Sequence, residues 1–397
     1  MGPHTTLSWK RNTAVCLSLI IFVSASGVAK AGPFPQRKQY NYLGKLTAEP
    51  VPTVEPSVLI PMSIEGQNKH RFLQISDDGK LLASVYGDRR NPMTLTVLDT
   101  STGRPTWQKE IDKKVHDIGM STARNEIFVW TSVKNSKRYK PPVPVAKVYD
   151  LASGEEKRTI VLGLDGRGNL WKAHYSKDQS KIAFVDSKGL TVVAADGSGT
   201  PARHSYDYYM QMYERKNGGS VPKVQWHGPS DSFVINTATL LRNNEARMLV
   251  WPISAEAPAL RHSEISKKRK RKQWVISPDG SFVVTNNTNE SGFEVAPIGA
   301  NDATKVHRRQ MFSRTPEVLD FLGDQNVVVH VTPYADVPEI LISNVDMDGA
   351  STGRILKGIQ PLQGRLEGVF VAVSADGSKI AAVMKDRSLA VWSVPAL

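Results

Sequence analysis

Residues 276–286 read ISPDGSFVVTN: an apolar stretch, a Ser-Pro-Asp-Gly turn and a second apolar stretch rich in β-branched residues. Proline presets the φ angle of a turn, aspartate can hydrogen-bond to its own backbone, and glycine adopts the left-handed conformation that tight turns require. The stretch therefore predicts two short antiparallel strands joined by a tight turn.

The same design recurs along the whole chain. The anchoring positions Ser76, Ser121, Ser176, Pro229, Ser277, Phe321 and Ser374 lie roughly 45 to 55 residues apart, a period typical of propeller blades or repeat arrays. The close relatives are ISDDGKLLASV (75–85), MSTARNEIFVW (120–130), YSKDQSKIAFV (175–185) and VSADGSKIAAV (373–383), and the weaker ones are HGPSDSFVINT (227–237) and DFLGDQNVVVH (320–330).

Each repeat is long enough for four strands. A third strand is expected in stretches such as TLTVLDTSTG (94–103) and LAVWSV (389–394), and a fourth in stretches such as TWQKEI (106–111). The last repeat ends after its third strand, whereas residues 57–63 (SVLIPMS) form an extra strand-like segment before the first repeat. Pairing the two would remove an open sheet edge. We therefore expect an all-β fold, a seven-bladed β-propeller of four-stranded blades, with the ring closed by an N-terminal strand; an open β-solenoid would leave the missing strand unexplained.

These repeats resemble the WD40-like repeats of bacterial propellers, including the TolB-type family with its SPDG-K-I-A-F pattern. The stretches ISPDGSFVV, YSKDQSKIAF and VSADGSKIAAV carry the resemblance, which extends over about residues 57–397. The Gly-His and Trp-Asp dipeptides of strict WD40 repeats are missing. The resemblance implies the fold and no specific activity, because propellers carry many unrelated functions.

The N-terminus predicts export. Lys10 and Arg11 precede an apolar stretch from Ala14 to Val23, and the sequence Ala29-Lys30-Ala31 follows. This order is typical of a signal peptide, with cleavage after Ala31, rather than of a buried N-terminal helix. The apolar stretch is shorter than the about 20 residues that span a bilayer. We expect a signal peptide (1–31), a Pro-rich extended arm (32–56) and a single propeller (57–397), in a secreted or periplasmic protein that is not transmembrane.

Charge suggests an anionic partner. The chain has a net charge of +13, and removing residues 1–31 takes away three cations and no acids, which leaves +10. The run Lys267, Lys268, Arg269, Lys270, Arg271 and Lys272 falls between the expected fourth strand of one blade and the first strand of the next. Such a run is either a solvated loop or a patch that binds an envelope or extracellular polyanion. Base-stacking aromatic residues are few nearby, which disfavours nucleic acid.

Two further groups of residues are candidates for binding. Tyr206, Tyr209 and Tyr213 have helical spacing in a long connection, where they either pack onto the propeller or present rings to a ligand. His174 and His227 are expected two residues before their anchors, on the innermost strands of neighbouring blades. They are weak candidates for a metal site, since a catalytic metal normally has three protein ligands. Packing between blades is the alternative, and no cofactor is expected.

No catalytic motif is present. The chain lacks a G-x-S-x-G elbow, an H-E-x-x-H motif and a Walker A loop, and its one cysteine, Cys16, lies in the expected signal peptide. We therefore expect a non-catalytic propeller that binds a protein or an anionic polymer on one face. The alternative is a hydrolase or lactonase-like enzyme whose dispersed residues meet at the mouth of the central channel.

Overall fold

In the computed structural model the chain divides into two units, residues 1–38 and 39–397. The structure describes the second unit only in part. The residues described are 53–62, 69–88, 90–133, 142–163, 170–205, 224–236, 247–262, 274–287, 292–297, 307–308, 317–323, 327–331, 340–346, 349–356, 363–364, 368–369, 371–384 and 386–394.

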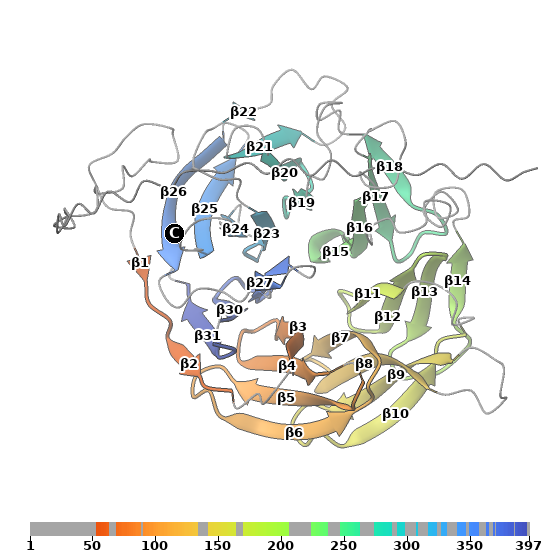
Figure 1. Ribbon diagram of the computed structural model, residues 1–397. Helices are drawn as coiled ribbons and strands as arrows, with labels where there is room; N and C mark the ends of the chain where they lie inside the picture. Colours follow the sequence, from red (N-terminus) through yellow and green to blue (C-terminus); the bar gives the residue numbers. More distant parts are fainter. Residues whose placement is uncertain are drawn as a thin grey trace, which may run out of the picture. The chain divides into compact units, whose positions relative to one another are not determined.

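The fold is all-β, and successive stretches of chain form small antiparallel sheets in a propeller arrangement (Figure 1). The first half contains β3 (Lys69–Ile75), β4 (Leu81–Gly87), β5 (Met93–Asp99), β6 (Pro105–Ile111), β7 (Val115–Ser121), β8 (Glu126–Val133), β9 (Val143–Asp150), β10 (Glu156–Val161), β11 (Leu170–Tyr175), β12 (Lys181–Asp186), β13 (Gly189–Ala194) and β14 (Ala202–Ser205). These strands form the sheets β3–β6, β7–β10 and β11–β14, each with its strands in sequence order.

The second half repeats this order. It contains β15 (Val224–His227), the 3-10 helix η1 (Gly228–Ser230), β16 (Ser232–Asn236), β17 (Arg247–Pro252), β18 (Ala259–His262), β19 (Trp274–Ile276), β20 (Phe282–Asn287), β21 (Gly292–Pro297), β22 (His307–Arg308), β23 (Glu317–Phe321), β24 (Val327–Val331), β25 (Ile340–Asp346), β26 (Gly349–Leu356), β29 (Val371–Val373), β30 (Lys379–Val383) and β31 (Leu389–Ser393). A separate two-stranded sheet, β27 (Gln363–Gly364) with β28 (Gly368–Val369), lies in the connection from β26 to β29.

A Ser–Asp turn joins the first two strands of several sheets, as the sequence predicted. In the first sheet, the Ser76 hydroxyl donates to Asp78 at 2.7 Å and accepts from the amide of Leu81 at 2.9 Å. The same two contacts occur at Ser277, with Asp279 at 2.6 Å and the amide of Phe282 at 3.0 Å. Gly79 and Gly280 have φ of +69° and +71°, which explains the glycine in these turns.

Apolar clusters between neighbouring sheets form the core. Val97 of the first sheet packs with Met120 of the second, and Trp130 of the second lies edge-on to Phe184 of the third at 4.9 Å. Similar clusters continue around the molecule, and the last one joins the sheet of β29–β31 to the first sheet through residues such as Val391 and Leu82. Each sheet is therefore packed between two others, and the sheets form a ring.

The ring closes through an N-terminal strand. β2 (Val58–Ile60) pairs antiparallel with β31, and the side chain of Ile60 is buried against the closing cluster. Within the expected segment 57–63, the pairing with the last sheet is confirmed for Val58–Ile60. A further contact was not expected, since β1 (Thr53–Val54), within the predicted extended arm, pairs parallel with β26 as a fifth strand of the preceding sheet.

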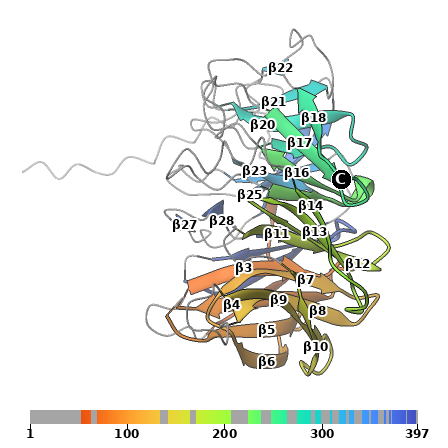
Figure 2. The same cartoon turned by 90° about the vertical axis from the view of Figure 1, so that its right-hand side faces the viewer.

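The two ends of the sheets form different faces. Because the strands are antiparallel, the first strand of every sheet begins on one face, here called the start face, and ends at the Ser–Asp turns on the other, here called the turn face. Connections from the fourth strand of one sheet to the next sheet lie at the start face. Figure 2 shows the ring from the side.

Candidate functional site

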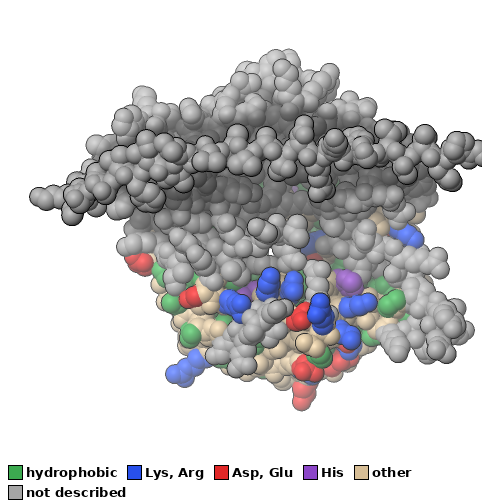
Figure 3. Space-filling view, viewed as in Figure 1, with side chains coloured by type: hydrophobic (Ala, Val, Ile, Leu, Met, Phe, Trp, Pro, Cys, Tyr) green, Lys and Arg blue, Asp and Glu red, His purple; other side chains and the backbone are tan. Residues whose placement is uncertain are grey.

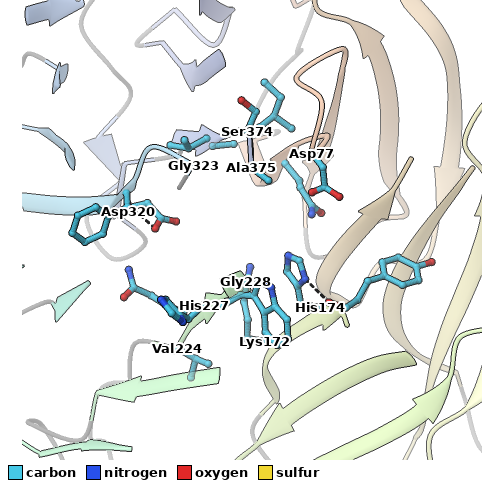
Figure 4. Close-up of a pocket in the computed structure, with 18 of the residues that line it drawn as sticks. Asp77, Lys172, His174, Val224, His227, Gly228, Asp320, Gly323, Ser374 and Ala375 are labelled. Atoms are coloured by element: carbon cyan, nitrogen blue, oxygen red, sulfur yellow. Dashed lines mark hydrogen bonds between the residues drawn. The ribbon is translucent and has the colours of Figure 1, made fainter. Parts of the chain in front are cut away.

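The first strands of the sheets surround a central cavity of about 670 Å³. Its lining comes from β3, β7, β11, β15, β19, β23 and β29 and from several of the turns that follow them. Figure 4 shows Asp320 on one side of this cavity and His174 and Asp77 on the other. Side chains from distant repeats therefore meet at a single site.

His174 is held in one orientation at the cavity wall. Its ring stacks on the indole of Trp226, with 4.7 Å between centroids and 8° between planes. Its Nδ1 lies 2.8 Å from the carbonyl oxygen of Tyr175, so Nδ1 carries the proton because a carbonyl only accepts. Burial lowers the pKa of His174 to about 4. The imidazole is thus neutral near pH 7, and Nε2 has a lone pair.

His227 has a different role. The prediction that His174 and His227 occupy equivalent positions is wrong, because His227 pairs with Ser232 and therefore stands where Ser176 stands in the neighbouring sheet. Its Nε2 donates to the carbonyl of Ser277 at 2.9 Å, and its Nδ1 bonds the hydroxyl of Ser230. Both nitrogens are engaged, and the histidine joins two neighbouring sheets.

The same correction applies to two predicted anchors. Pro229 lies within η1, so His227 is the true anchor of its sheet. In β23, the amide of Leu322 rather than that of Phe321 bonds the next strand, at the carbonyl of Val327. The strand shifts register between Val318 and Asp320, which the sequence pattern did not indicate.

The corrected register brings two polar side chains to the cavity that sequence reasoning missed. Asp320 and Gln225 occupy the positions equivalent to His174. The predicted anchors Phe321 and Pro229 would instead place Leu319 and His227 there, two residues earlier. The spacing of paired residues could have identified these two positions. The true anchor of each sheet pairs with the residue five positions later, as Ser76, His227 and Leu322 all do.

Opposite charges are also present at the cavity. The ammonium of Lys172 lies 3.4 Å from the buried carboxylate of Asp117, which also accepts from the amide of Ala173 at 2.8 Å. Burial raises the pKa of Asp117, and Lys172 opposes that rise. Asp77 lies at the turn-face end, where the protein surrounds part of its carboxylate although the residue as a whole is exposed. This partial burial and the nearby carboxylates of Asp78 and Asp376 raise its pKa.

The two faces differ in charge across the described residues. On the start face cations outnumber anions: Lys69, Arg71, Arg90, Lys113, Lys114, Lys172, Lys188, Arg203 and Arg387 against Asp88, Glu110, Asp112, Asp117, Asp186 and Asp386. Three of these anions form salt bridges: Asp112 with Lys147, Asp117 with Lys172 and Asp186 with Arg203. Figure 3 shows Lys and Arg side chains gathered on the described part of this face.

The turn face has the opposite balance. Its described anions are Asp77, Asp78, Asp99, Glu126, Asp150, Glu155, Glu156, Asp178, Asp196, Asp231, Glu256, Asp279, Asp320 and Asp376, and its described cations are Lys80, Arg104, Arg124, Lys157, Arg158, Lys177, Lys181 and Lys379. Several of these aspartates are fixed by the turns themselves, as Asp178 is by Ser176 and Ser180, whose hydrogen bonds lower its pKa to about 2. The repeated turn thus makes this face acidic.

Several predicted site residues lie outside the described residues. They are the basic run Lys267–Lys272 and the tyrosines Tyr206, Tyr209 and Tyr213, together with the predicted signal peptide. The basic run falls in the connection from β18 to β19, and the tyrosines fall in the connection from β14 to β15. The described strands on either side of each connection have their adjoining ends on the start face.

The described part of the chain has neither a metal-binding cluster nor a helix that could span a membrane. It contains no group of three or more His, Cys, Asp or Glu residues placed to hold a metal ion. It also has no helix whose length and apolar character would suit a bilayer span.

Comparison with known proteins does not assign the chain to a family. No family model matches it, and no curated protein matches its sequence. Any function must therefore be argued from the fold and the site.

Proposed function

We propose that the protein is an exported, non-catalytic β-propeller of seven blades that binds an anionic polymer through its start face. The blade count is supported by the sheets that begin with β3, β7, β11, β15, β19, β23 and β29, each of four strands or more. Export is supported by the N-terminal pattern around Lys10, Arg11 and Ala31.

The unequal charge of the two faces carries the proposal. A face with excess cations produces a positive potential that attracts a polyanion over about 8 Å at physiological ionic strength. Lys69, Arg90, Lys113 and Lys114 are exposed there. The acidic turn face would repel the same polymer, so binding is expected on one side only.

The basic run strengthens the proposal. Both strands that flank it, β18 and β19, have their adjoining ends on the start face. The six adjacent cations in the sequence between these two strands would add to a charge excess that the described residues have without them. An exported protein meets envelope or extracellular polyanions rather than the genome, and the few aromatic residues near the run also disfavour nucleic acid.

The test compares two sets of charge removals in the mature chain that begins at Gly32. The first combines Lys69→Gln, Arg90→Gln, Lys113→Gln and Lys114→Gln on the start face. The matched control combines Lys80→Gln, Arg104→Gln, Lys157→Gln and Lys181→Gln, which are exposed residues of the turn face. Both sets remove three lysines and one arginine, so they change the net charge equally.

We expect the start-face variant to elute from a heparin column at lower salt than the wild type, and the control to elute nearly unchanged. Each lost ionic contact lowers the slope of log affinity against log salt by about one. Replacing Lys268, Arg269, Lys270 and Arg271 with Ser should act like the start-face set. Equal effects of the two matched sets, or no retention of the wild type, would rule out a polyanion site on this face.

A further inference from the structure

The central cavity reaches the turn face at a mouth lined mostly by small residues. Several sheets contribute to this mouth the residue that follows their anchor: Asp77, Lys177, Gly228, Pro278, Gly323 and Ala375. Only the first two of these are charged. The cavity behind the mouth has a volume of about 670 Å³, within the range of about 300 to 1,000 Å³ that is typical of small-molecule sites.

Apolar residues line much of the cavity below the mouth. They include Leu73, Ile75, Ile118, Val224, Val371 and Val373. The stacked rings of His174 and Trp226 add a rigid aromatic part. Such a lining stabilises the apolar body of a ligand by removing it from water.

Most charged groups of the cavity already have partners. Lys172 forms a salt bridge with the buried Asp117. Arg71 and Asp320 also have interactions within the protein, Arg71 with the carbonyl of Gly87 and Asp320 with the amide that follows it. These groups therefore do not call for a charged ligand.

Asp77 is the exception. Within the described part of the chain, no hydrogen bond or ion pair engages its carboxylate. Partial burial raises its pKa, and so do the charges of two further carboxylates, Asp78 and Asp376. Lys177, the other charged residue of the mouth, acts on the carboxylate of Asp231 instead. The cavity thus has one carboxylate that an incoming cation would compensate.

His174 supplies a neutral acceptor on the same side of the cavity as Asp77 (Figure 4). Because its Nδ1 donates to the carbonyl of Tyr175, its Nε2 keeps a lone pair. No described residue donates a hydrogen bond to this nitrogen. A cationic group that carries N–H donors suits both the carboxylate and the imidazole.

We propose that the cavity binds an organic cation with one ammonium group and an apolar body. The ammonium group is held at Asp77 by a charge-assisted hydrogen bond, His174 accepts a second one, and the apolar body lies along the cavity lining. One uncompensated carboxylate fits one positive charge, which favours a monoamine over a polyamine. The ligand enters from the turn face, opposite to the face proposed to bind a polyanion.

The test uses isothermal titration calorimetry with phenethylamine, tyramine and tryptamine as probes. The alcohol 2-phenylethanol is the neutral control, because it has nearly the shape of phenethylamine and no charge. We expect saturable binding of at least one amine, and binding of 2-phenylethanol about tenfold weaker or less than that of phenethylamine.

Two variants test the assigned residues. Asp77→Asn should weaken amine binding about tenfold, and His174→Phe, which keeps a ring against Trp226, about threefold. Glu155→Gln is the matched control, since it removes one exposed carboxylate from the same face outside the cavity, and should leave binding unchanged.

The melting temperature of Asp77→Asn provides a second readout. It should equal or exceed that of the wild type, because the variant loses no described partner and removes the repulsion from Asp78 and Asp376. A clearly lower melting temperature would show that the fold already compensates this carboxylate, and would overturn its assignment as the ammonium site.

Three binding results would also overturn the proposal. The first is no saturable heat for any amine at about 10 mM, the weak end of measurable affinity. The second is equal binding of phenethylamine and 2-phenylethanol, or binding that Asp77→Asn leaves intact. The third is tighter binding of spermidine than of every monoamine, which would assign a polycation. Heparin retention of Asp77→Asn should match that of Glu155→Gln, so that the two proposals fail or hold independently.

Discussion

The serine of the Ser–Asp turn performs the same task in repeats far apart in the chain. Ser76, Ser176 and Ser277 each donate to the aspartate two residues later and accept from the amide five residues later. All of these partners lie within six residues, so the turn is specified by local sequence. For that reason the strand pairs and their order could be predicted.

We predict that Ser277→Ala destabilises the protein and that Ser281→Ala does so much less. Ser277 is fully buried, and its loss leaves the amide of Phe282 without its side-chain partner, at a cost of about 1 to 3 kcal/mol. Ser281 bonds the same aspartate, Asp279, but is exposed. Urea midpoints of the two variants provide the measurement, and equal midpoints would contradict a structural role for the buried hydroxyl.

The residues of the cavity could be predicted only in part. His174 was identified because its repeat follows the common pattern. Asp320 and Gln225 were missed because Phe321 and Pro229 were aligned by resemblance to other repeats, whereas the strand pairing depends on backbone register. The convergence of these residues is a property of the ring and is not contained in any one repeat.

Among the elements, the N-terminal strands differ in what specifies them. β2 could be predicted because residues 57–63 are apolar and lie before the first repeat at the spacing expected of a fourth strand. β1 could not, since Thr53–Val54 is a two-residue strand without an apolar pattern of its own. Its position follows from the exposed edge that β26 offers beside the closing sheet.

We predict that the closing strand is essential to a stable monomer. A chain that begins at Gly66 lacks β2, exposes the edge of β31 and loses the buried side chain of Ile60, worth about 2 kcal/mol by itself. It should melt earlier and aggregate. The matched control begins at Glu55, which removes β1 but keeps β2, and should remain monomeric.

Size-exclusion chromatography with light scattering and thermal melting measure both truncations. A chain from Gly66 that stays monomeric and melts like the mature protein would show that the pairing of β2 with β31 contributes little.

For the molecule as a whole, three histidines are placed where protonation is unfavourable. Burial lowers the pKa of His70, His174 and His227. His70 donates from Nε2 to the carbonyl of Arg387 in the last sheet, and His227 donates to that of Ser277, so both join neighbouring sheets. The ring therefore contains neutral imidazoles at several of its sheet junctions.

We predict that stability falls with acid below about pH 6.5. The unfolded chain binds protons to these histidines near that pH, whereas the folded protein does so only at lower pH, about 4 for His174. The neutral histidines therefore make their full contribution to the free energy of unfolding above pH 6.5. This contribution is lost progressively as the pH falls towards 4, by about 1 to 3 kcal/mol for His174. Urea unfolding at several pH values measures the loss.

The variant His174→Phe serves as the comparison, because it keeps a ring against Trp226 and cannot titrate. Its stability should change less between pH 6.5 and pH 4.5 than that of the wild type. The same pH dependence in both proteins would mean that His174 does not contribute to it.

The closing pair also sets an order of events during synthesis. Ser57, next to β2, bonds the carbonyl of Val391, 334 positions later. Closing a loop of that length costs roughly 3 kcal/mol more than closing one of ten residues. β2 must therefore wait for β31, so the ring cannot close until both of these strands have been made. For the export proposed above, this delay would keep the ring open until its closing strands have both been made.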